Sequence, residues 1–186
     1  MTNFTLYPAK KADLHRIKRL YKQAFPPNER KPWANMQQLC KDNKGEILAL
    51  QQNGQFAGLA ITLHHRDLVL LDYLAVEPGQ RSHGIGSLAL SALQNRYQNR
   101  RLVVEIERPD APGMNKPLCE RRREFYRRAG LLDTGLIAHV YQTEFLLLTP
   151  NQPLTFAEYY DLYYQLFGAE TCSFLGIRDI SPKARL

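Results

Sequence analysis

Apolar residues recur at helical spacing in the first part of the chain. Between Leu14 and Phe25, apolar side chains return every three or four positions, which places them on one face of a helix. This helix is expected to end before Pro26, because the residue preceding a proline disfavours helical conformation. A loop rich in proline and charge follows, and residues 35–42 are expected to form a short second helix.

The middle of the chain changes to a strand pattern. Residues 46–52 and 55–65 are two apolar runs that flank Asn53-Gly54, the dipeptide that most strongly predicts a two-residue hairpin turn. Residues 68–76 are almost continuously apolar, which is typical of a strand buried on both faces. We therefore expect three consecutive strands here.

Helices and strands alternate in the remainder. A helical stripe of apolar residues is formed by Ile85, Leu88, Ala89, Ala92 and Leu93. The expected elements after it are a strand at 101–107, a helix at 118–130 ended by Gly130, one or two strands within 135–149, and a helix at 155–167. The last helix opens with a Thr155-x-x-Glu158 capping box, and its many aromatic residues are interpreted as packing groups.

The order of these elements predicts an α/β (α+β) fold. An antiparallel meander that runs into a parallel crossover implies a mixed sheet with helices on its faces. A chain of 186 residues fits one compact domain. We assign residues 1–167 to a single domain and 168–186 to a C-terminal tail without an assigned role.

Composition and charge narrow the function classes. The hydrophobic fraction is 44%, and no apolar run reaches membrane-spanning length. The first sixteen residues lack the apolar core of a signal peptide, so we expect a cytoplasmic protein with no membrane partner. The net charge of +7 favours an anionic partner, which nucleic acid, a membrane surface or a phosphorylated cofactor would each satisfy.

The cysteine and histidine positions do not indicate a metal site. Cys40, Cys119 and Cys172 are scattered and form no CxxC pair, so neither a zinc site nor a disulfide framework is predicted. We interpret them as buried or inert thiols. The histidines show no metal-ligand spacing with nearby acids.

The segment QRSHGIGSLAL, residues 80–90, has the composition of a phosphate-binding loop. Gly84 and Gly86 precede a helix, whose first N–H groups attract anions. Gly79 and Gly84 have the spacing of a P-loop, but Ile85 and Gly86 stand where that motif needs Lys and Ser or Thr. A P-loop is therefore excluded.

A second template is the dinucleotide fingerprint G-x-G-x-x-A, matched from Gly84 to Ala89. Glu105 and Glu107 lie about twenty residues further on, where a ribose-binding acid would be expected. However, the segment EPGQRSH separates the end of the preceding strand from the first glycine. An NAD(P)-binding oxidoreductase is kept as an alternative.

The third template is R/Q-x-x-G-x-G/A, matched by Arg81-Ser82-His83-Gly84-Ile85-Gly86. With the preceding strand LLDYLAVEP, the acidic strand LVVEIE and the later FYRRAGL, the sequence resembles the GNAT superfamily of N-acetyltransferases over roughly Phe4–Phe167. The resemblance implies a mostly antiparallel sheet of six or seven strands. It also implies acetyl-CoA as acetyl donor, with its pyrophosphate in the glycine loop. The cofactor-binding residues implied are Leu74, Val76, Arg81, Ser82, His83, Gly84, Ile85, Gly86 and Ser87.

Elementary chemistry supports a diphosphate at this loop. Successive N–H groups at a loop and a helix start can hold two phosphates, and side chains at Gly84 and Gly86 would obstruct their approach. Arg81 adds a fixed positive charge.

Catalytic roles follow from the same resemblance. Transfer of an acetyl group to an amine needs a proton acceptor, and a glutamate is common in the family at the position of Glu105. Glu107 is the alternative base, on the same strand face, and Asp72 is a third carboxylate that fits a buried structural acid. The resemblance assigns Tyr126 as the acid that protonates the departing thiolate. A core aromatic is the alternative for Tyr126.

Two features of the helical segment 118–130 differ from the usual GNAT pattern or are not explained by it. Cys119 stands where many members of the family carry an asparagine that contacts the cofactor, and Asn115 is a candidate replacement. The segment also carries a basic run, at Arg121, Arg122, Arg123, Arg127 and Arg128. This run fits RNA, the 3′-phosphate of coenzyme A or a solvated helix face, and no nucleic-acid-binding motif accompanies it.

The sequence thus predicts an acetyl-CoA-dependent N-acetyltransferase that acts on a primary amine of a small molecule or peptide by direct attack, without a metal. The alternative is a non-catalytic module of the same fold that binds coenzyme A or nucleic acid. Nucleic acid is disfavoured as a partner, and the chain is expected to be a monomer or homodimer. Glu29, in the proline-rich loop, is a candidate for attracting a cationic acceptor, with pairing to Arg30 or Lys31 as the alternative.

Overall fold

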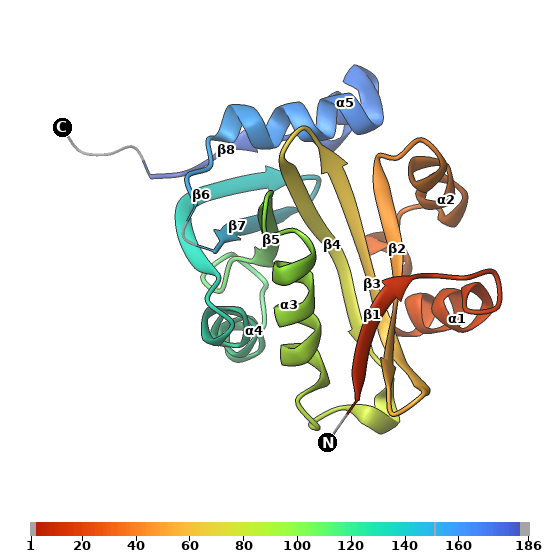
Figure 1. Cartoon of the computed structure of the whole chain (residues 1–186). Helices are drawn as coiled ribbons and strands as arrows, with labels where there is room; N and C mark the ends of the chain where they lie inside the picture. The colour runs from red at the N-terminus through yellow and green to blue at the C-terminus, as the bar shows by residue number, and fades with distance from the viewer. Residues whose placement is uncertain (1–2, 151, 183–186) are drawn as a thin grey trace. The chain divides into compact units, whose positions relative to one another are not determined.

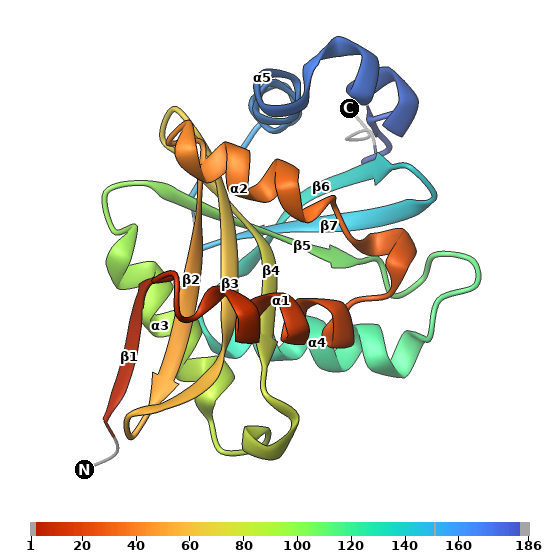
Figure 2. The ribbon, with the colours of Figure 1, turned by 90° about the vertical axis from the view of Figure 1, so that its right-hand side faces the viewer.

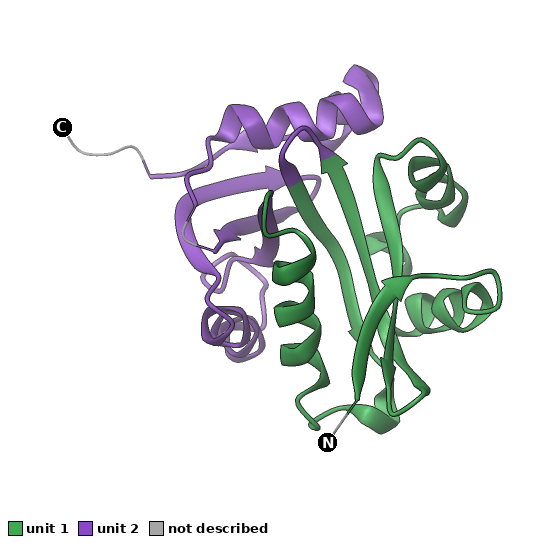
Figure 3. Cartoon of the chain, viewed as in Figure 1, with its two compact units in different colours: residues 1–64, 69–99 green, residues 65–68, 100–186 purple. Residues whose placement is uncertain are grey.

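The structure is a computed structural model that describes residues 3–150 and 152–182 (Figure 1). These residues contain five α-helices and eight strands. The chain divides into two compact units (Figure 3): the first is Met1–His64 with Val69–Asn99, and the second is His65–Leu68 with Arg100–Leu186. Each unit has its own strands and helices.

The first unit holds four strands and three helices. In spatial order its strands are β1 (Phe4–Pro8), β2 (Gly45–Gln52), β3 (Gln55–His65) and β4 (Leu68–Val76). β1 pairs with β2, and β2 with β3, in antiparallel register. The helices α1 (Leu14–Ala24) and α2 (Trp33–Lys41) cover one face of these strands, and α3 (Ile85–Arg96) lies on the other (Figures 1 and 2).

The hairpin between β2 and β3 confirms the prediction from Asn53-Gly54. Both residues have positive φ, 50° at Asn53 and 78° at Gly54. A two-residue turn with positive φ at both positions matches the right-handed twist of the strands that it joins. The predicted first helix and the strand at 68–76 are also present.

One detail of the predicted helical stripe in α3 is wrong. Ile85, Ala89, Leu90 and Leu93 are buried, whereas Leu88 is 40% exposed. At 100° per residue, Leu88 lies about 120° from the centre of the stripe that these four residues define. The buried face therefore includes Leu90 and leaves Leu88 at the surface.

The second unit holds four strands and two helices. In spatial order its strands are β5 (Arg101–Glu107), β7 (Thr143–Thr149), β6 (Leu132–Val140) and β8 (Arg178–Asp179). All three pairings between them are antiparallel. Helix α4 (Lys116–Arg128) packs against β5, and helix α5 (Phe156–Leu175) packs against β6.

The structure confirms the α/β fold with a mostly antiparallel arrangement of strands. The described residues have eight strands, where the resemblance implies six or seven, and β1 and β8 are the two strands that the sequence pattern did not predict. β8 has only two residues, too few for an alternating pattern to be visible in the sequence. Gly130 follows α4 with a φ of 83°, as expected of a residue that ends a helix.

The segment after residue 167 is an integral part of the second unit. α5 continues to Leu175 across a kink at Gly168, whose φ of 82° is not helical. Beyond it, β8 pairs with β6, and the Ile180 N–H donates to the Ile137 carbonyl at 2.9 Å. Cys172 is buried on the second half of α5. These residues therefore cover one edge of β6.

Candidate active site

The glycine loop of the first unit leads directly into α3. Gly84 is the N-cap of the helix, with a φ of 74°, and no heavy atom lies within 4 Å of the position that a Cβ would take there. No side chain caps this helix end among the described residues. The first bond of the helical ladder is that from the Leu88 N–H to the Gly84 carbonyl, at 3.0 Å. The N–H groups of Ile85, Gly86 and Ser87 precede this ladder.

Arg81 holds the start of the loop against the end of β4. Its Nε donates to the Val76 carbonyl at 3.2 Å, while Arg81, Ser82, His83 and Gly84 are exposed. Ser82 also has a positive φ, of 65°. The loop thus combines an exposed cation, two residues in the left-handed backbone conformation and a helix start without a side-chain cap.

These residues fit a diphosphate. A Cβ at residue 84 would occupy the open space in front of the helix start. Because Gly84 has no Cβ, this space stays open. The helix N-terminus carries a partial positive charge, which an anion stabilises. Leu74 and Val76 pack with their side chains against a cluster that includes Ile85 and Ala89, so β4 is fixed to the helix that follows the loop.

Glu105, on β5, is held by two tyrosines of α5. Tyr159 Oη donates to Glu105 Oε1 at 2.6 Å, and Tyr163 Oη donates to the same oxygen at 2.8 Å. Both tyrosine side chains are buried, and their rings lie 5.2 Å apart. The aromatic residues of this helix do pack, as predicted, but two of them also bind the carboxylate.

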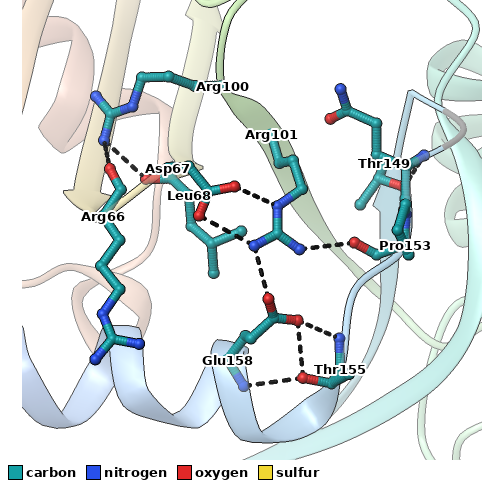
Figure 4. A network of polar contacts seen from close by, with 10 residues as sticks. Arg66, Asp67, Leu68, Arg100, Arg101, Thr149, Pro153, Thr155 and Glu158 are labelled. Carbon is teal, nitrogen blue, oxygen red and sulfur yellow. Dashed lines mark hydrogen bonds and ion pairs between the residues drawn. The ribbon is translucent and has the colours of Figure 1, made fainter.

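A network of polar contacts fixes the start of α5 beside β5 (Figure 4). Arg101 Nη2 donates to Glu158 Oε1 at 2.7 Å, and Arg101 Nε donates to Asp67 Oδ2 at 2.6 Å. The predicted capping box is present, with Glu158 Oε2 accepting from both the N–H and the hydroxyl of Thr155 at 2.8 Å. Because Arg101 and Glu105 are four residues apart on β5, this anchor helps to set where Tyr159 and Tyr163 meet the strand.

The two glutamates of β5 are bound by different helices. Glu107 forms an ion pair with Arg122 of α4, whereas Glu105 is bound by the α5 tyrosines. Glu107 therefore has a cationic partner on α4, and the partners of Glu105 include two hydroxyl donors on α5. The two glutamates, which alternation along the strand places on one face, therefore contact different helices.

Tyr126 lies in the same unit, on α4. It is 9% exposed, and its ring makes an edge contact with Phe125 at 5.1 Å between centroids. Burial raises the pKa of Tyr126 to about 12; Arg122 lowers it and Glu107 raises it further, to a smaller extent. The phenol is therefore protonated at neutral pH and can donate a proton.

The sequence of this chain matches a known protein family. The family profile described as the acetyltransferase (GNAT) family matches residues 14–130, which is more than half of the chain. The chain belongs to the GNAT acetyltransferase family. The matched range includes the glycine loop, Glu105 and Tyr126, and it ends before Tyr159 and Tyr163. No curated protein sequence matches the chain.

Solved GNAT structures share the fold. A GNAT-family protein from Bacteroides thetaiotaomicron is 17% identical, covers 89% of this chain and 99% of its own, and gives a TM-score of 0.67. The ribosomal-protein-S18-alanine N-acetyltransferase from Escherichia coli is 19% identical, with 82% and 96% covered and a TM-score of 0.57. A GNAT acetyltransferase from Elizabethkingia anophelis, solved with acetyl-CoA bound, is 15% identical, with 79% and 97% covered and a TM-score of 0.56.

Cys119 and Asn115, where the sequence departs from the GNAT pattern, have different surroundings at α4. Cys119 is buried, and burial raises the pKa of its thiol. Asn115 is the N-cap of α4, and its Oδ1 accepts a hydrogen bond from the Leu118 N–H at 3.2 Å. Capping the helix is thus a structural task for Asn115, and its suggested role as a replacement cofactor ligand stays a prediction. Cys172 is also buried and Cys40 is half-buried, and burial raises the pKa of both free thiols.

The basic run of α4 is only partly a solvated face. Arg122 binds Glu107, and Arg123 binds Asp133 and lies 3.8 Å from Glu120. The other three members of the run, Arg121, Arg127 and Arg128, are exposed. Ion pairs within the unit therefore account for two of the five arginines.

Glu29, the candidate for attracting the acceptor, lies in the first unit. Glu29 is exposed, and its carbonyl accepts from the Tyr73 hydroxyl at 2.8 Å, while the neighbouring Lys31 forms an ion pair with Asp72. Within residues 3–150 and 152–182, no group of three or more His, Cys, Asp or Glu side chains is arranged to hold a metal ion. In the same residues, no helix has both the length and the hydropathy needed to cross a bilayer.

Sequence reasoning missed Tyr159 and Tyr163 as site residues. A period of four between them places both on one helix face, and the glutamate that they bind is 54 and 58 residues away. The only signal in the sequence was an excess of tyrosine on a helix that already had apolar residues to pack.

Proposed function

We propose that this GNAT acetyltransferase transfers the acetyl group of acetyl-CoA to a primary amine of a small molecule or peptide by direct attack. The observation that carries the proposal is the uncapped start of α3 behind a left-handed Gly84, in a loop that also contains Arg81. It provides N–H donors, space and positive charge for the diphosphate of the acetyl donor. The backbone of β4 at Leu74 and Val76 would bind the arm that follows the diphosphate.

Glu105 is the proposed proton acceptor. The amine nitrogen forms a bond to the acetyl carbon, and the carbon–sulfur bond then breaks. Glu105 takes the proton that the nitrogen loses, directly or through a water molecule. Tyr159 and Tyr163 are positioning residues, because their hydroxyls hold the carboxylate in one orientation.

Tyr126 is the proposed proton donor to the departing thiolate. A phenol with a pKa of about 12 remains protonated at neutral pH, and it can donate to an anion that forms beside it. After the reaction, exchange with water returns one proton to Tyr126 and removes one from Glu105. The products are an N-acetylated amine and free coenzyme A.

We further propose that residues 1–167 carry the acetyltransferase activity as one domain, whose second unit residues 168–182 complete, and that the chain works as a monomer or homodimer. A domain of about this length is supported by the solved GNAT structures, of which 96–99% is covered by 79–89% of this chain. A peptide acceptor is supported by the Escherichia coli enzyme, whose name specifies an alanine of a ribosomal protein.

Two measurements test the proposal. Acetyl-CoA at one hundred times its Kd should stabilise the fold by about 2.7 kcal/mol, seen as a rise in Tm. Thiol release with a panel of primary amines and peptides should then exceed release without acceptor. A rise in Tm without thiol release for any acceptor would favour the non-catalytic binding module, and stabilisation by NAD(P) in place of acetyl-CoA would favour the oxidoreductase.

A further inference from the structure

Most of the positive charge of this chain belongs to the first unit. This unit holds 12 Lys and Arg residues against 6 Asp and Glu, whereas the second unit holds 13 against 12. The first unit therefore carries +6 of the net charge of +7. In the second unit, Arg101, Arg108 and Arg122 each pair with a carboxylate. Such an asymmetry predicts an anionic partner for the first unit.

Helix α1 presents part of this charge on one exposed face. Its residues Leu14–Ala24 include no Asp or Glu. Four exposed residues, which we call the α1 basic face, lie within an arc of about 100° and extend over about 10 Å of the helix axis: His15, Lys18, Arg19 and Lys22. The apolar side of the helix is buried, at Ile17, Leu20 and Tyr21. The helix therefore lies with its apolar side in the core and its cations in solvent.

The protein itself neutralises little of the α1 basic face. Arg19 lies 3.6 Å from Glu77, but its side chain is 55% exposed, so solvent weakens this pair. Among residues 3–150 and 152–182, Lys18 and Lys22 form no ion pair. An ordinary protein surface intersperses both signs of charge, whereas a surface of one sign attracts polyions of the other.

The proposed site for the acetyl donor does not account for this face. Its diphosphate is assigned to the loop that ends at Gly84, the N-cap of α3. In the first unit, α1 and α3 lie on opposite faces of the strands (Figures 1 and 2). The cations of α1 are therefore available to a second anion.

The composition of the α1 basic face favours the phosphates of a nucleic-acid duplex. The only aromatic residue of α1, Tyr21, is buried, so the helix has no ring on which an unpaired base would stack. A protein partner is held by aromatic or apolar anchors, and the face has none. A helix that lies in a membrane surface needs a free apolar side, and that of α1 is buried. A duplex requires only cations, because it carries one phosphate per about 1.7 Å of its axis.

We propose that the α1 basic face binds the phosphate backbone of a nucleic-acid duplex without reading its sequence. This inference goes beyond the proposed acetyl transfer and does not depend on it. The sequence disfavours nucleic acid as a partner because it contains no base-reading motif. Phosphate contacts need no such motif, since they hold a protein on a duplex and carry no sequence information.

The test measures binding of the full chain to a labelled 16-base-pair RNA duplex, and to the DNA duplex of the same sequence, by fluorescence anisotropy between 50 and 200 mM KCl. Lys18→Gln combined with Lys22→Gln should weaken binding about ten- to hundredfold at the low-salt end. The slope of log K against log salt should become less steep by about 1.8, as expected for two lost phosphate contacts. Loss on either duplex supports the proposal.

The matched control combines Arg127→Gln with Arg128→Gln. It changes the net charge by the same amount at two exposed positions of the second unit. Duplex affinity and the salt slope should stay within error of the wild type. Because Lys18 and Lys22 are exposed and lie away from α3, their double variant should keep the Tm and the acetyl-CoA affinity of the wild type.

Three outcomes would overturn the proposal. The first is no duplex binding by the wild type at 50 mM KCl. The second is an equal loss of duplex affinity in the two double variants, which would assign binding to net charge in place of α1. The third is unchanged duplex binding in the α1 variant, together with lost binding to vesicles that contain 30% phosphatidylserine, which would assign the face to a membrane surface.

Discussion

Gly84 and Gly54 adopt nearly the same backbone conformation in two different settings. Their φ values are 74° and 78°, and nothing lies within 4 Å of either Cβ position. A side chain at either residue therefore costs about 1 kcal/mol of backbone strain. Only Gly84 stands in front of a helix start, so the two glycines form a matched pair for testing the cofactor loop.

Gly84→Asp should lower acetyl-CoA affinity about a hundredfold or more. The new carboxylate would lie beside phosphate, and two like charges 4 Å apart near a protein surface repel by about 4 kcal/mol. Isothermal titration calorimetry measures the change. Gly54→Asp carries the same strain in the hairpin turn and should bind acetyl-CoA normally. Equal affinities in the two folded variants would contradict the loop assignment.

Glu105→Gln and Tyr126→Phe should each lower turnover by about a hundredfold to ten-thousandfold, the usual effect of removing a proton-transfer group. Acetyl-CoA affinity should be nearly unchanged, because neither group is assigned to hold the phosphates. Steady-state turnover across pH, with an acceptor found by screening, checks both.

The control for the first of these variants is Glu144→Gln, which removes a glutamate of β7 that is paired with Arg108 at 2.8 Å. It should keep wild-type turnover. Near wild-type activity in Tyr126→Phe would mean that solvent or another group protonates the thiolate. Unchanged activity in Glu105→Gln would transfer the role of base to Glu107 or to water.

At the scale of elements, α5 binds side chains at two positions of β5, Arg101 and Glu105. Glu158 and Tyr159 in its first turn bind Arg101 and Glu105, and Tyr163 in its second turn also binds Glu105. The helix thus orients the candidate base although it lies outside the range matched by the family profile. The two predictions that follow separate its catalytic contribution from its structural one.

Tyr163→Phe should lower kcat about tenfold or more and leave the Kd of acetyl-CoA unchanged. The substitution keeps the packed ring and deletes one of two hydrogen bonds to a charged group. Tyr160→Phe is the matched control, because Tyr160 stacks on Tyr164 in the same helix. If both variants behave alike, the tyrosines of α5 serve packing alone.

Glu158→Gln should change the acid stability of the protein. Hydrogen bonds from Arg101, and to a smaller extent from the N–H and hydroxyl of Thr155, together lower the pKa of Glu158 to about 2. A carboxyl whose pKa is lower in the folded state stabilises the fold above its unfolded pKa of about 4.5, and this contribution is lost as pH falls toward 2.

Urea unfolding at pH 7, 4.5 and 3 measures this effect. Wild type should be more stable than Glu158→Gln at pH 7, and the difference should shrink at pH 3. The side chain is 36% exposed, so solvent screens part of the interaction. A difference that stays constant over this range would show that charge is not the cause.

At the scale of the whole molecule, the chain beyond residue 167 completes the second unit. It supplies the end of α5, the strand β8, and the Ser181 hydroxyl, which accepts from the Ile137 N–H at 2.8 Å. Removing these residues would expose the edge of β6 and the surface that Cys172 covers. The predicted boundary at 167 coincides with the kink at Gly168, so a defined test is available there.

A chain ending at residue 167 should have a lower Tm than the full chain and retain measurable acetyl-CoA binding, because the glycine loop belongs to the first unit. Differential scanning calorimetry and calorimetric titration measure the two properties. An unchanged Tm would mean that residues 168–182 contribute nothing to stability. Loss of acetyl-CoA binding in a folded truncated chain would place part of the binding site in the removed segment.

The sequence by itself determined the features that depend on neighbours along the chain. Asn53-Gly54 predicted its turn, Thr155-x-x-Glu158 its cap, and the glycine loop the start of α3, because positive φ, capping and helical periodicity are properties of a few consecutive residues. The family resemblance rested on the same kind of local motif. The error at Leu88 arose because the buried face of a helix is set by what packs against it.

Only the tertiary structure decided which side chains meet. Tyr159 and Tyr163 reach Glu105 across 54 and 58 residues, and Lys31 reaches Asp72 across 41. Such contacts depend on how strands and helices pack, and a periodic pattern records which face is buried without recording its partner. The fold of this protein could therefore be predicted from local signals, whereas the groups that orient its carboxylates could not.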